Sequence, residues 1–242
     1  MQNKCLVLFQ GRKMPRLPRL NLPDYPQHVI QRGNNRHPCF NSEKDYPIYL
    51  AKLSEYADQF KVEIHSYVLM SNHVHLLLTP KVGNGTSLMM QALGRYYVRY
   101  FNKQYKRTGT LWEGRFKSSI IDSDFYFLTV SRYLELNPVR AKMVQHPLQY
   151  KWSSYHCNAG LKPNKRLTPH AIYLALGNTK KKRSESYIAL FDTEIPDYCI
   201  KEIRGAINST RILGNEVFKR RLEKQTGLIL IPELWGGNRY PQ

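Results

Sequence analysis

The stretch EIHSYVLMSNHVHLLLT, residues 63–79, contains the pattern that decides the fold. Two runs rich in aliphatic, β-branched and aromatic residues, Glu63 to Met70 and His73 to Thr79, flank the short link Ser71-Asn72. Runs of this length and composition are typical of β-strands, and a short link between them predicts an antiparallel hairpin.

The second of these strands carries two histidines separated by one residue. Successive side chains of a strand point to opposite faces, so His73 and His75 share one face while Val74 lies on the other. Neutral imidazole is a common metal ligand, and two imidazoles on one strand face supply two coordination positions. Taken alone, the spacing equally allows two half-exposed histidines that bind nothing.

The segments on either side of the hairpin supply further strands and helices. In chain order we expect a strand at His28–Arg32, a helix from an N-cap at Ser42 to Phe60, the hairpin, a helix at Ser87–Tyr105, a strand within residues 110–122, and a helix that is capped by Ser123 or Asp124 and ends near Asn137. This order predicts an α+β fold, with a central antiparallel sheet flanked by helices.

The character of the chain changes after about Trp152. Short helical stretches at Asp197–Asn208 and Asn215–Gln225 alternate with loops, and the charge run KKKR, residues 180–183, is typical of a flexible solvated segment. We therefore predict a main domain over residues 14–150 and a small, mainly helical C-terminal extension over residues 151–242. The residues before Met14 are interpreted as an upstream extension.

The charge balance indicates a polyanionic partner. The chain has 37 Lys and Arg against 18 Asp and Glu, a formal charge of +19 and a pI of about 9.8. Such an excess costs self-repulsion in the compact state, which a polyanion offsets. The 17 tyrosines add aromatic faces on which unpaired bases can stack. A solvated basic surface is the alternative.

Cysteine usage and hydropathy exclude other classes of protein. The four cysteines, Cys5, Cys39, Cys157 and Cys199, form no CxxC pair, which argues against a disulfide framework and a cysteine-based zinc site. A reducing, cytoplasmic setting follows. No apolar run approaches the roughly 20 residues that span a bilayer, so we expect no membrane partner.

A tyrosine and an asparagine near the end of the last predicted helix could complete a site. Tyr133 and Asn137 are four residues apart and so share one helix face. An asparagine oxygen can bind a metal, and a tyrosine hydroxyl can attack a group that the metal polarises. Spacing alone leaves open that Tyr133 only packs and Asn137 only caps the helix, and Tyr126, on the same face, is a rival nucleophile.

Basic residues are concentrated at positions suited to phosphate contact. Arg95, Arg99, Lys103 and Arg107 recur about every four residues and form a stripe on the predicted helix, and only Glu113 interrupts the basic character of this region. Such contacts hold DNA without reading its sequence. The full set of predicted DNA-binding residues is Arg32, Arg36, Arg95, Arg99, Lys103, Arg107, Arg115 and Lys117.

Four motifs together resemble one protein family. HVIQRGNNRHPCF (28–40), VLMSNHVHLLLTP (68–80), GTLWEGRFKSSIID (109–122) and RYLELNPVRAKMV (132–144) are similar, in this order, to the REP-associated tyrosine transposases, relatives of the single-tyrosine HUH transposases. The likeness covers about Met14 to Val144. LGNEVFKRRLEKQTG (213–227) resembles a C-terminal helix present in part of that family.

The resemblance implies roles for the candidate residues. It makes His73 and His75 ligands of Mg²⁺ or Mn²⁺, Asn137 the third ligand, and Tyr133 the nucleophile that forms a 5′-phosphotyrosine intermediate at hairpin-associated single-stranded DNA. It also implies an HUH-endonuclease, ferredoxin-like fold, a bacterial, nucleoid-associated protein, and an accessory DNA contact by residues 151–242. We expect a monomer or a weak dimer. The alternatives are a catalytically silent regulator that binds hairpin DNA and a metal-dependent phosphoesterase that uses water.

Overall fold

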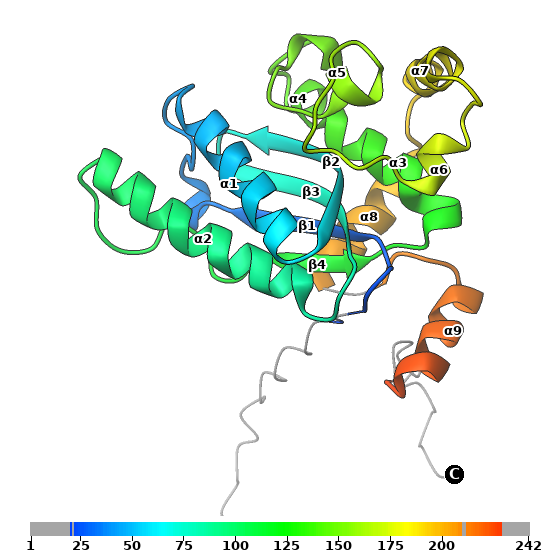
Figure 1. Ribbon diagram of the computed structural model, residues 1–242, viewed down its shortest axis with the longest axis horizontal. Coiled ribbons are helices and arrows are strands. Elements are labelled where there is room, and N and C mark those ends of the chain that lie inside the picture. Colours follow the sequence, from blue (N-terminus) through cyan, green and yellow to red (C-terminus); the bar gives the residue numbers. More distant parts are fainter. Residues whose placement is uncertain (1–19, 21, 210–211, 229–242) are drawn as a thin grey trace, which may run out of the picture.

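The computed structural model describes residue 20, residues 22–209 and residues 212–228 (Figure 1). The segment before Met14, and residues 14–19 at the start of the predicted main domain, lie outside the described residues. Four strands form one sheet in the order β2-β3-β1-β4, and all neighbours are antiparallel. The strands are β1 (Gln27–Arg32), β2 (Val62–Met70), β3 (His73–Pro80) and β4 (Lys117–Ile120).

Two helices cover one face of this sheet, as Figure 1 shows. Helix α1 (Asp45–Gln59) connects β1 to β2, and helix α2 (Gly85–Gln104) connects β3 to β4. The chain therefore follows a βαββαβ order, as in ferredoxin-like folds, and the predicted α+β fold with an antiparallel sheet is confirmed. The predicted hairpin is β2–β3.

The core on this face follows from the alternation of the strands. Val74, Leu76 and Leu78 of β3 are fully buried, and they pack in one cluster with Tyr49 and Leu53 of α1. Because these residues alternate with His73 and His75, burying them turns both histidines to the opposite face.

The beginning of α1 differs from the prediction. The N-cap is Lys44, and Ser42 was the wrong residue. The carboxylate of Asp45 accepts hydrogen bonds from the backbone N–H groups of Asn41 and Ser42 at 2.8 and 2.9 Å, and from the hydroxyls of two tyrosines, Tyr100 and Tyr105. The carboxylate of Asp45 is fully buried, and its four donors tie the first turn of α1 to the residues before it and to the end of α2.

Helix α3 (Ser123–Glu135) and helix α8 (Asp197–Ser209) lie behind the sheet in Figure 1. The N-cap of α3 is Asp122, so the caps predicted at Ser123 or Asp124 were wrong by one or two residues. Helix α3 ends at Glu135, and the short helix α4 (Asn137–Arg140) begins after the single residue Leu136, so the predicted end near Asn137 is confirmed.

The C-terminal part of the chain packs on this second layer. It contains the helices α5 (Tyr155–Asn158), α6 (Ala171–Leu174), α7 (Lys180–Ala189), α8 and α9 (Glu216–Thr226) and follows the 3-10 turn η2 (Pro147–Gln149). The run KKKR forms the first turn of α7 and is capped by Thr179, so the prediction of a flexible segment was wrong. Tyr187, 1% exposed, holds that helix to Glu135 of α3 through a 2.9 Å hydrogen bond.

Candidate active site

The two histidines of β3 point to the face of the sheet that α3 covers. In the register of β1 with β3, Arg32 is opposite His73 and Ile30 is opposite His75. The two imidazole ring centres lie 5.0 Å apart, and His75 is buried while His73 is half-buried. The expected placement of both imidazoles on one face is therefore confirmed, and their role as metal ligands stays a prediction.

A hydrogen bond sets which nitrogen of His73 is free. The Nδ1 of His73 lies 2.6 Å from Oδ1 of Asn72, while Nδ2 of Asn72 donates to the carbonyl of Arg36 at 3.1 Å. The second bond orients the amide, so the Asn72 oxygen can only accept and His73 Nδ1 carries the proton. The lone pair on His73 Nε2 is then available for a ligand.

A third histidine, His28 of β1, lies at this site and was not predicted from the sequence. Its Nε2 lies 2.8 Å from Nδ1 of His75, and the two rings stack with centres 5.0 Å apart. When His75 Nδ1 donates this bond, His75 Nε2 is free beside His73 Nε2. Only the pairing of β1 with β3 reveals this contact, since His28 precedes His75 by 47 residues.

The surroundings keep these imidazoles neutral. Burial lowers the pKa of His28 to about 3 and the pKa of His73 to about 4. The pKa of His75 is well below its ordinary value, chiefly because of burial and then because of the neighbouring His28 and His73. Near neutral pH all three rings are uncharged, which is the form that binds metals.

Tyr133 of α3 packs against this group. Its ring centre lies 6.0 Å from that of His28 and 6.1 Å from that of His75, edge to face in both cases, and the residue is 5% exposed. The rival Tyr126 is directed elsewhere, because its hydroxyl donates to Glu202 of α8 at 2.9 Å. The structure thus brings Tyr133, and not Tyr126, to the histidines. Its role as nucleophile stays a prediction.

Asn137 and Arg140 both bind the backbone of Tyr133. Asn137 Nδ2 donates to the Tyr133 carbonyl at 3.2 Å, and Arg140 Nη2 donates to the same oxygen at 2.7 Å. The Arg140 guanidinium also lies 4.1 Å from the centre of the Tyr133 ring, and burial lowers its pKa. Arg140 was missed, although its spacing of seven residues from Tyr133 within one motif was a usable signal.

The donor set limits the kind of metal site that these residues can form. The described residues contain no group of three His, Cys, Asp or Glu side chains placed to hold a metal ion. His28 adds no third ligand, because its Nε2 is bonded to His75. A site here would combine two imidazole nitrogens with neutral oxygens, and the Asn137 amide oxygen is the predicted one.

The predicted DNA-binding residues fall into two groups. Arg95, Arg99 and Arg115 line a cavity of about 730 Å³ between α2 and β1, and Arg32, Arg115 and Lys117 line one of about 210 Å³ on the histidine face. Arg36, Lys103 and Arg107 are exposed and line neither cavity.

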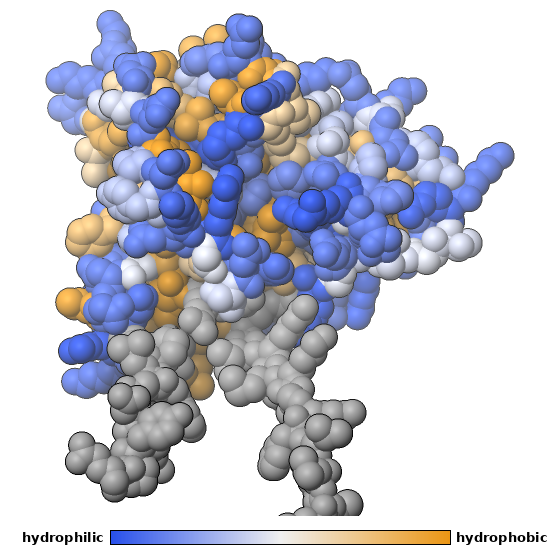
Figure 2. Space-filling view, turned by 180° about the vertical axis from the view of Figure 1, so that it is seen from behind, coloured by the Kyte–Doolittle hydropathy of each residue, from blue (hydrophilic) through white to orange (hydrophobic). Residues whose placement is uncertain are grey.

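None of the eight predicted DNA-binding residues forms an ion pair with another described residue. Figure 2 shows the end of the molecule around the carboxyl end of α2 as an almost continuous hydrophilic surface.

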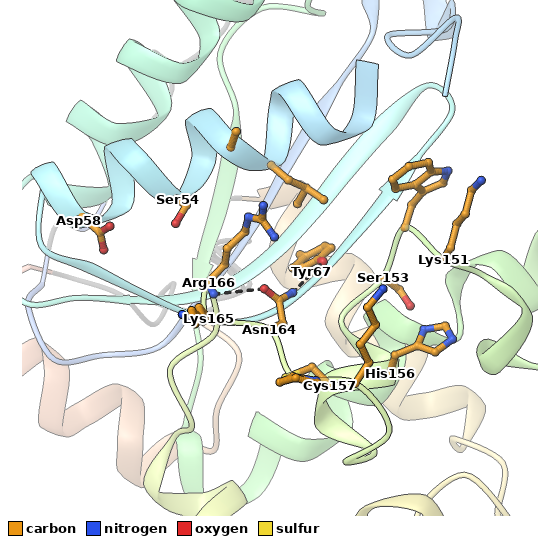
Figure 3. A pocket seen from close by; sticks show the side chains of 15 residues that line it. Ser54, Asp58, Tyr67, Lys151, Ser153, His156, Cys157, Asn164, Lys165 and Arg166 are labelled. Carbon is orange, nitrogen blue, oxygen red and sulfur yellow. Dashed lines mark hydrogen bonds between the residues drawn. The ribbon is translucent and has the colours of Figure 1, made fainter. Parts of the chain in front are cut away.

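A third cavity is lined by none of His28, His73 and His75. It has a volume of about 770 Å³ and is bounded by α1, β2 and residues 151–166 (Figure 3). Lys151, Lys162, Lys165 and Arg166 line it, and Asp58 is its single acidic residue. Asn164 holds the wall by donating to the Tyr67 hydroxyl at 3.1 Å and accepting from the Arg166 backbone N–H.

Comparisons with known proteins match this fold and this segment. Residues 22–137 match the model of the family described as "Transposase IS200 like". A solved structure of a REP-associated tyrosine transposase bound to a REP hairpin is 18% identical, with a TM-score of 0.50, and the match covers 65% of this chain and 96% of that one. A crystal structure of a candidate transposase from Deinococcus radiodurans R1 is also 18% identical, with a TM-score of 0.33 and coverages of 56% and 96%.

At these identities the structural likeness shows the fold. The search of the curated proteins found no match. None of the helices in the described part of the chain combines the length and the hydropathy that a bilayer span requires.

Proposed function

We propose that this chain, whose residues 22–137 match the IS200-like transposase family, cuts and joins single strands of DNA with Tyr133 as the nucleophile. The observation that supports this most directly is the contact of the Tyr133 ring with both His75 and His28 on one face of the sheet. A tyrosine beside His75 can act on a phosphate that a metal ion bound by His73 and His75 would help to hold.

In the proposed reaction Tyr133 attacks the scissile phosphate of the DNA strand. The Tyr133 oxygen bonds to the scissile phosphorus, and the bond from phosphorus to the 3′ oxygen breaks. The proton that the phenol loses ends on the 3′ oxygen, which is released as a 3′-hydroxyl. The product is a 5′-phosphotyrosine. Because the phosphoester is retained, a 3′-hydroxyl can reverse the step and join strands without ATP.

We propose that His73, His75 and Asn137 hold a divalent ion, Mg²⁺ or Mn²⁺, next to Tyr133. Such an ion would draw charge from the phosphate oxygens. The bonds from His73 Nδ1 to Asn72 and from His75 Nδ1 to His28 support this proposal, because they leave Nε2 of both rings free. Arg140, held against Tyr133, adds a fixed positive charge where the phosphate would lie.

We propose hairpin-associated single-stranded DNA as the substrate, since the structure of similar fold was solved with a REP hairpin. The eight basic residues without ion pairs support a polyanionic partner. The basic cavity in Figure 3 supports an accessory DNA contact by residues 151–242. A bacterial cytoplasm, with nucleoid association, fits a DNA substrate.

A covalent-adduct assay tests this function. The protein is mixed, in Mn²⁺, with single-stranded oligonucleotides from the flanks of its own gene, and a protein–DNA band that survives denaturation is sought. Tyr133→Phe should abolish the band and leave DNA binding nearly intact, while the control Tyr126→Phe should form it. Cleavage without a covalent band would favour a phosphoesterase that uses water, and binding without cleavage would favour a silent regulator.

A further inference from the structure

The cavity of about 730 Å³ lies on the face of the sheet opposite the histidines. Gln31 of β1 is part of its floor, and it follows Ile30, which faces the histidine side opposite His75. Alternation along the strand therefore turns Gln31 toward α2. The other walls are α2 and the residues around Trp112 and Phe116.

Two buried polar groups at this floor have no partner. The Oε1 of Gln31 and the Nε1 of Trp112 form no hydrogen bond with the described residues, although these residues are only 7% and 6% exposed. Buried polar groups are nearly always paired, so an unpaired acceptor and an unpaired donor beside one cavity call for a ligand that complements them.

Gly94 of α2 lies next to both groups. A Cβ at this position would lie 3.8 Å from Gln31 Nε2 and 3.8 Å from Trp112 Nε1, so the glycine faces the two polar side chains directly. Because Gly94 has no side chain, nothing of its own stands between α2 and these two groups.

The indole is also held in place before any ligand binds. Gly33 pairs with Trp112 in a β-bridge, the Glu113 backbone N–H donates to the Arg32 carbonyl at 2.8 Å, and the Trp112 ring stacks on Tyr97. A donor fixed in this way loses little entropy when it binds.

The rim defines the charge of the ligand. Arg95, Arg99 and Arg115 line the cavity, no acidic residue does, and Met90 and Val98 supply apolar surface. The complementary ligand therefore has a flat apolar body, a polar edge with donors and acceptors, and flanking negative charge. A nucleotide within a single strand of DNA has these three properties.

We propose that this cavity binds one unpaired base of the DNA strand. The Gln31 amide and the Trp112 N–H bond to the edge of the base, and the three arginines bind the phosphates on either side. In either orientation the amide offers one donor and one acceptor, which is the pairing that amides make with base edges. The proposal rests on the proposed function in taking single-stranded DNA as the ligand.

The same strand can continue to the catalytic face. Arg115 lines this cavity and also the smaller one, where Arg32 and Lys117 lie on the histidine side of the sheet. Since β4 is the edge strand, a DNA strand can cross that edge at Arg115. The base site would thereby set which phosphate reaches Tyr133.

The test compares strands with and without bases. Fluorescence anisotropy is measured in EDTA, so that no cleavage occurs, with labelled homopolymers of A, C and T about 12 nucleotides long and with an abasic strand of equal length and charge. We expect wild type to bind at least one homopolymer about tenfold more tightly than the abasic strand, which corresponds to about one buried hydrogen bond.

Three variants locate that preference. Gly94→Leu fills the space above the floor, and Trp112→Phe removes the indole N–H while keeping an aromatic ring on Tyr97. Both variants should reduce the preference for base-bearing over abasic DNA to less than about twofold and leave the affinity for the abasic strand unchanged. Gly83→Leu is the matched control, because Gly83 is exposed, does not line the cavity and has nothing within 4 Å of the position of a Cβ. It should keep the preference of wild type. Thermal melting confirms that each variant is folded.

A measurement on wild type removes the dependence on variants. In an ¹⁵N-labelled sample the indole signal of Trp112, assigned by its loss in Trp112→Phe, should shift with the preferred homopolymer and stay in place with the abasic strand. Equal affinity of wild type for all strands, or an equal loss of base-bearing and abasic binding in Gly94→Leu, overturns the base site. The adduct assay is independent: an adduct without base preference leaves the proposed cleavage standing, and base preference without an adduct removes only the cleavage.

Discussion

The Nε2 of His28 lies 2.8 Å from Nδ1 of His75, and both rings are buried between the sheet and α3. This bond joins the first strand to the histidine motif and determines which nitrogen of His75 is free. Second-layer bonds of this kind orient metal-binding imidazoles, and their loss typically weakens metal binding about 10- to 100-fold.

His28→Leu should therefore weaken Mn²⁺ binding, measured by calorimetry, by about 10- to 100-fold while the protein stays folded. His28→Gln keeps an amide oxygen that can accept from His75, so it should lose less. Equal Mn²⁺ affinity in wild type and His28→Leu would mean that the bond plays no part in orienting His75.

His73→Ala and His75→Ala should each nearly abolish Mn²⁺ binding and strongly reduce the covalent adduct, because one imidazole cannot hold the ion alone. Asn137→Ala should be milder, since water can replace a neutral oxygen ligand. Calorimetry on all three decides between the ligands, with His146→Ala as an exposed histidine control. Unchanged affinity in both β3 variants would place the metal elsewhere.

Arg99 and Lys103 are exposed on α2, one turn apart, and should bind phosphates of a single strand. Replacing both by Ala should flatten the slope of log K against log salt by roughly one unit or slightly more, at about 0.7 per phosphate. Titrations at several salt concentrations, with native and scrambled hairpins, measure this slope, and the loss should be similar for both. Lys52→Ala with Lys81→Ala, two lysines that form ion pairs outside the predicted DNA-binding residues, is the control. An unchanged slope would place the DNA path away from α2.

Glu135 links α3 to the C-terminal helices while being fully buried. It accepts hydrogen bonds from Ser154, Asn158 and Tyr187, yet burial raises its pKa to about 7 from an ordinary 4.5. Below pH 4.5 the carboxyl is protonated in both the folded and the unfolded chain. As the pH rises toward 7, the unfolded chain loses this proton first, so the free energy of unfolding falls by about 3 kcal/mol.

Glu135→Gln should remove this fall, because the amide does not ionise. The variant should match wild type near pH 4.5 and exceed its free energy of unfolding by up to about 3 kcal/mol at pH 8. Urea denaturation across this range provides the measurement, and the difference between the two proteins isolates Glu135 from the histidines. Glu185→Gln, an exposed change on α7, should leave the pH dependence as it is in wild type. If the free energies of unfolding of wild type and Glu135→Gln changed with pH in the same way, Glu135 would not be the group that titrates.

Helix ends and the C-terminal charge run were less predictable than the elements themselves. The sequence predicted α1 and α3, but their caps are Lys44 and Asp122 and not the polar residues expected. Asp45 binds donors from α2 as well as from its own turn, so a tertiary contact selected the boundary. Likewise Lys180 to Arg183 are helical because Tyr187 anchors the later turns of α7 to Glu135.

The sequence by itself determined the features that depend on local periodicity. Alternation around His73-Val74-His75 specifies a strand with both imidazoles on one face, and the order of runs specifies an antiparallel sheet flanked by helices. The charge of +19 predicts a polyanionic partner, and that partner stays a prediction. Each of these follows from residues within a few positions of one another, or from a sum over the chain.

Only the tertiary structure decided which distant residues meet. The pairing of β1 with β3 brings His28 to His75, the packing of α3 selects Tyr133 over Tyr126, and α2 closes over Gln31 and Trp112. These contacts join elements separated by long stretches of chain, and their register is set by how the hydrophobic faces pack together. Periodicity assigns a residue to a face of its own strand or helix, whereas its partner across the core depends on the packing of the whole domain.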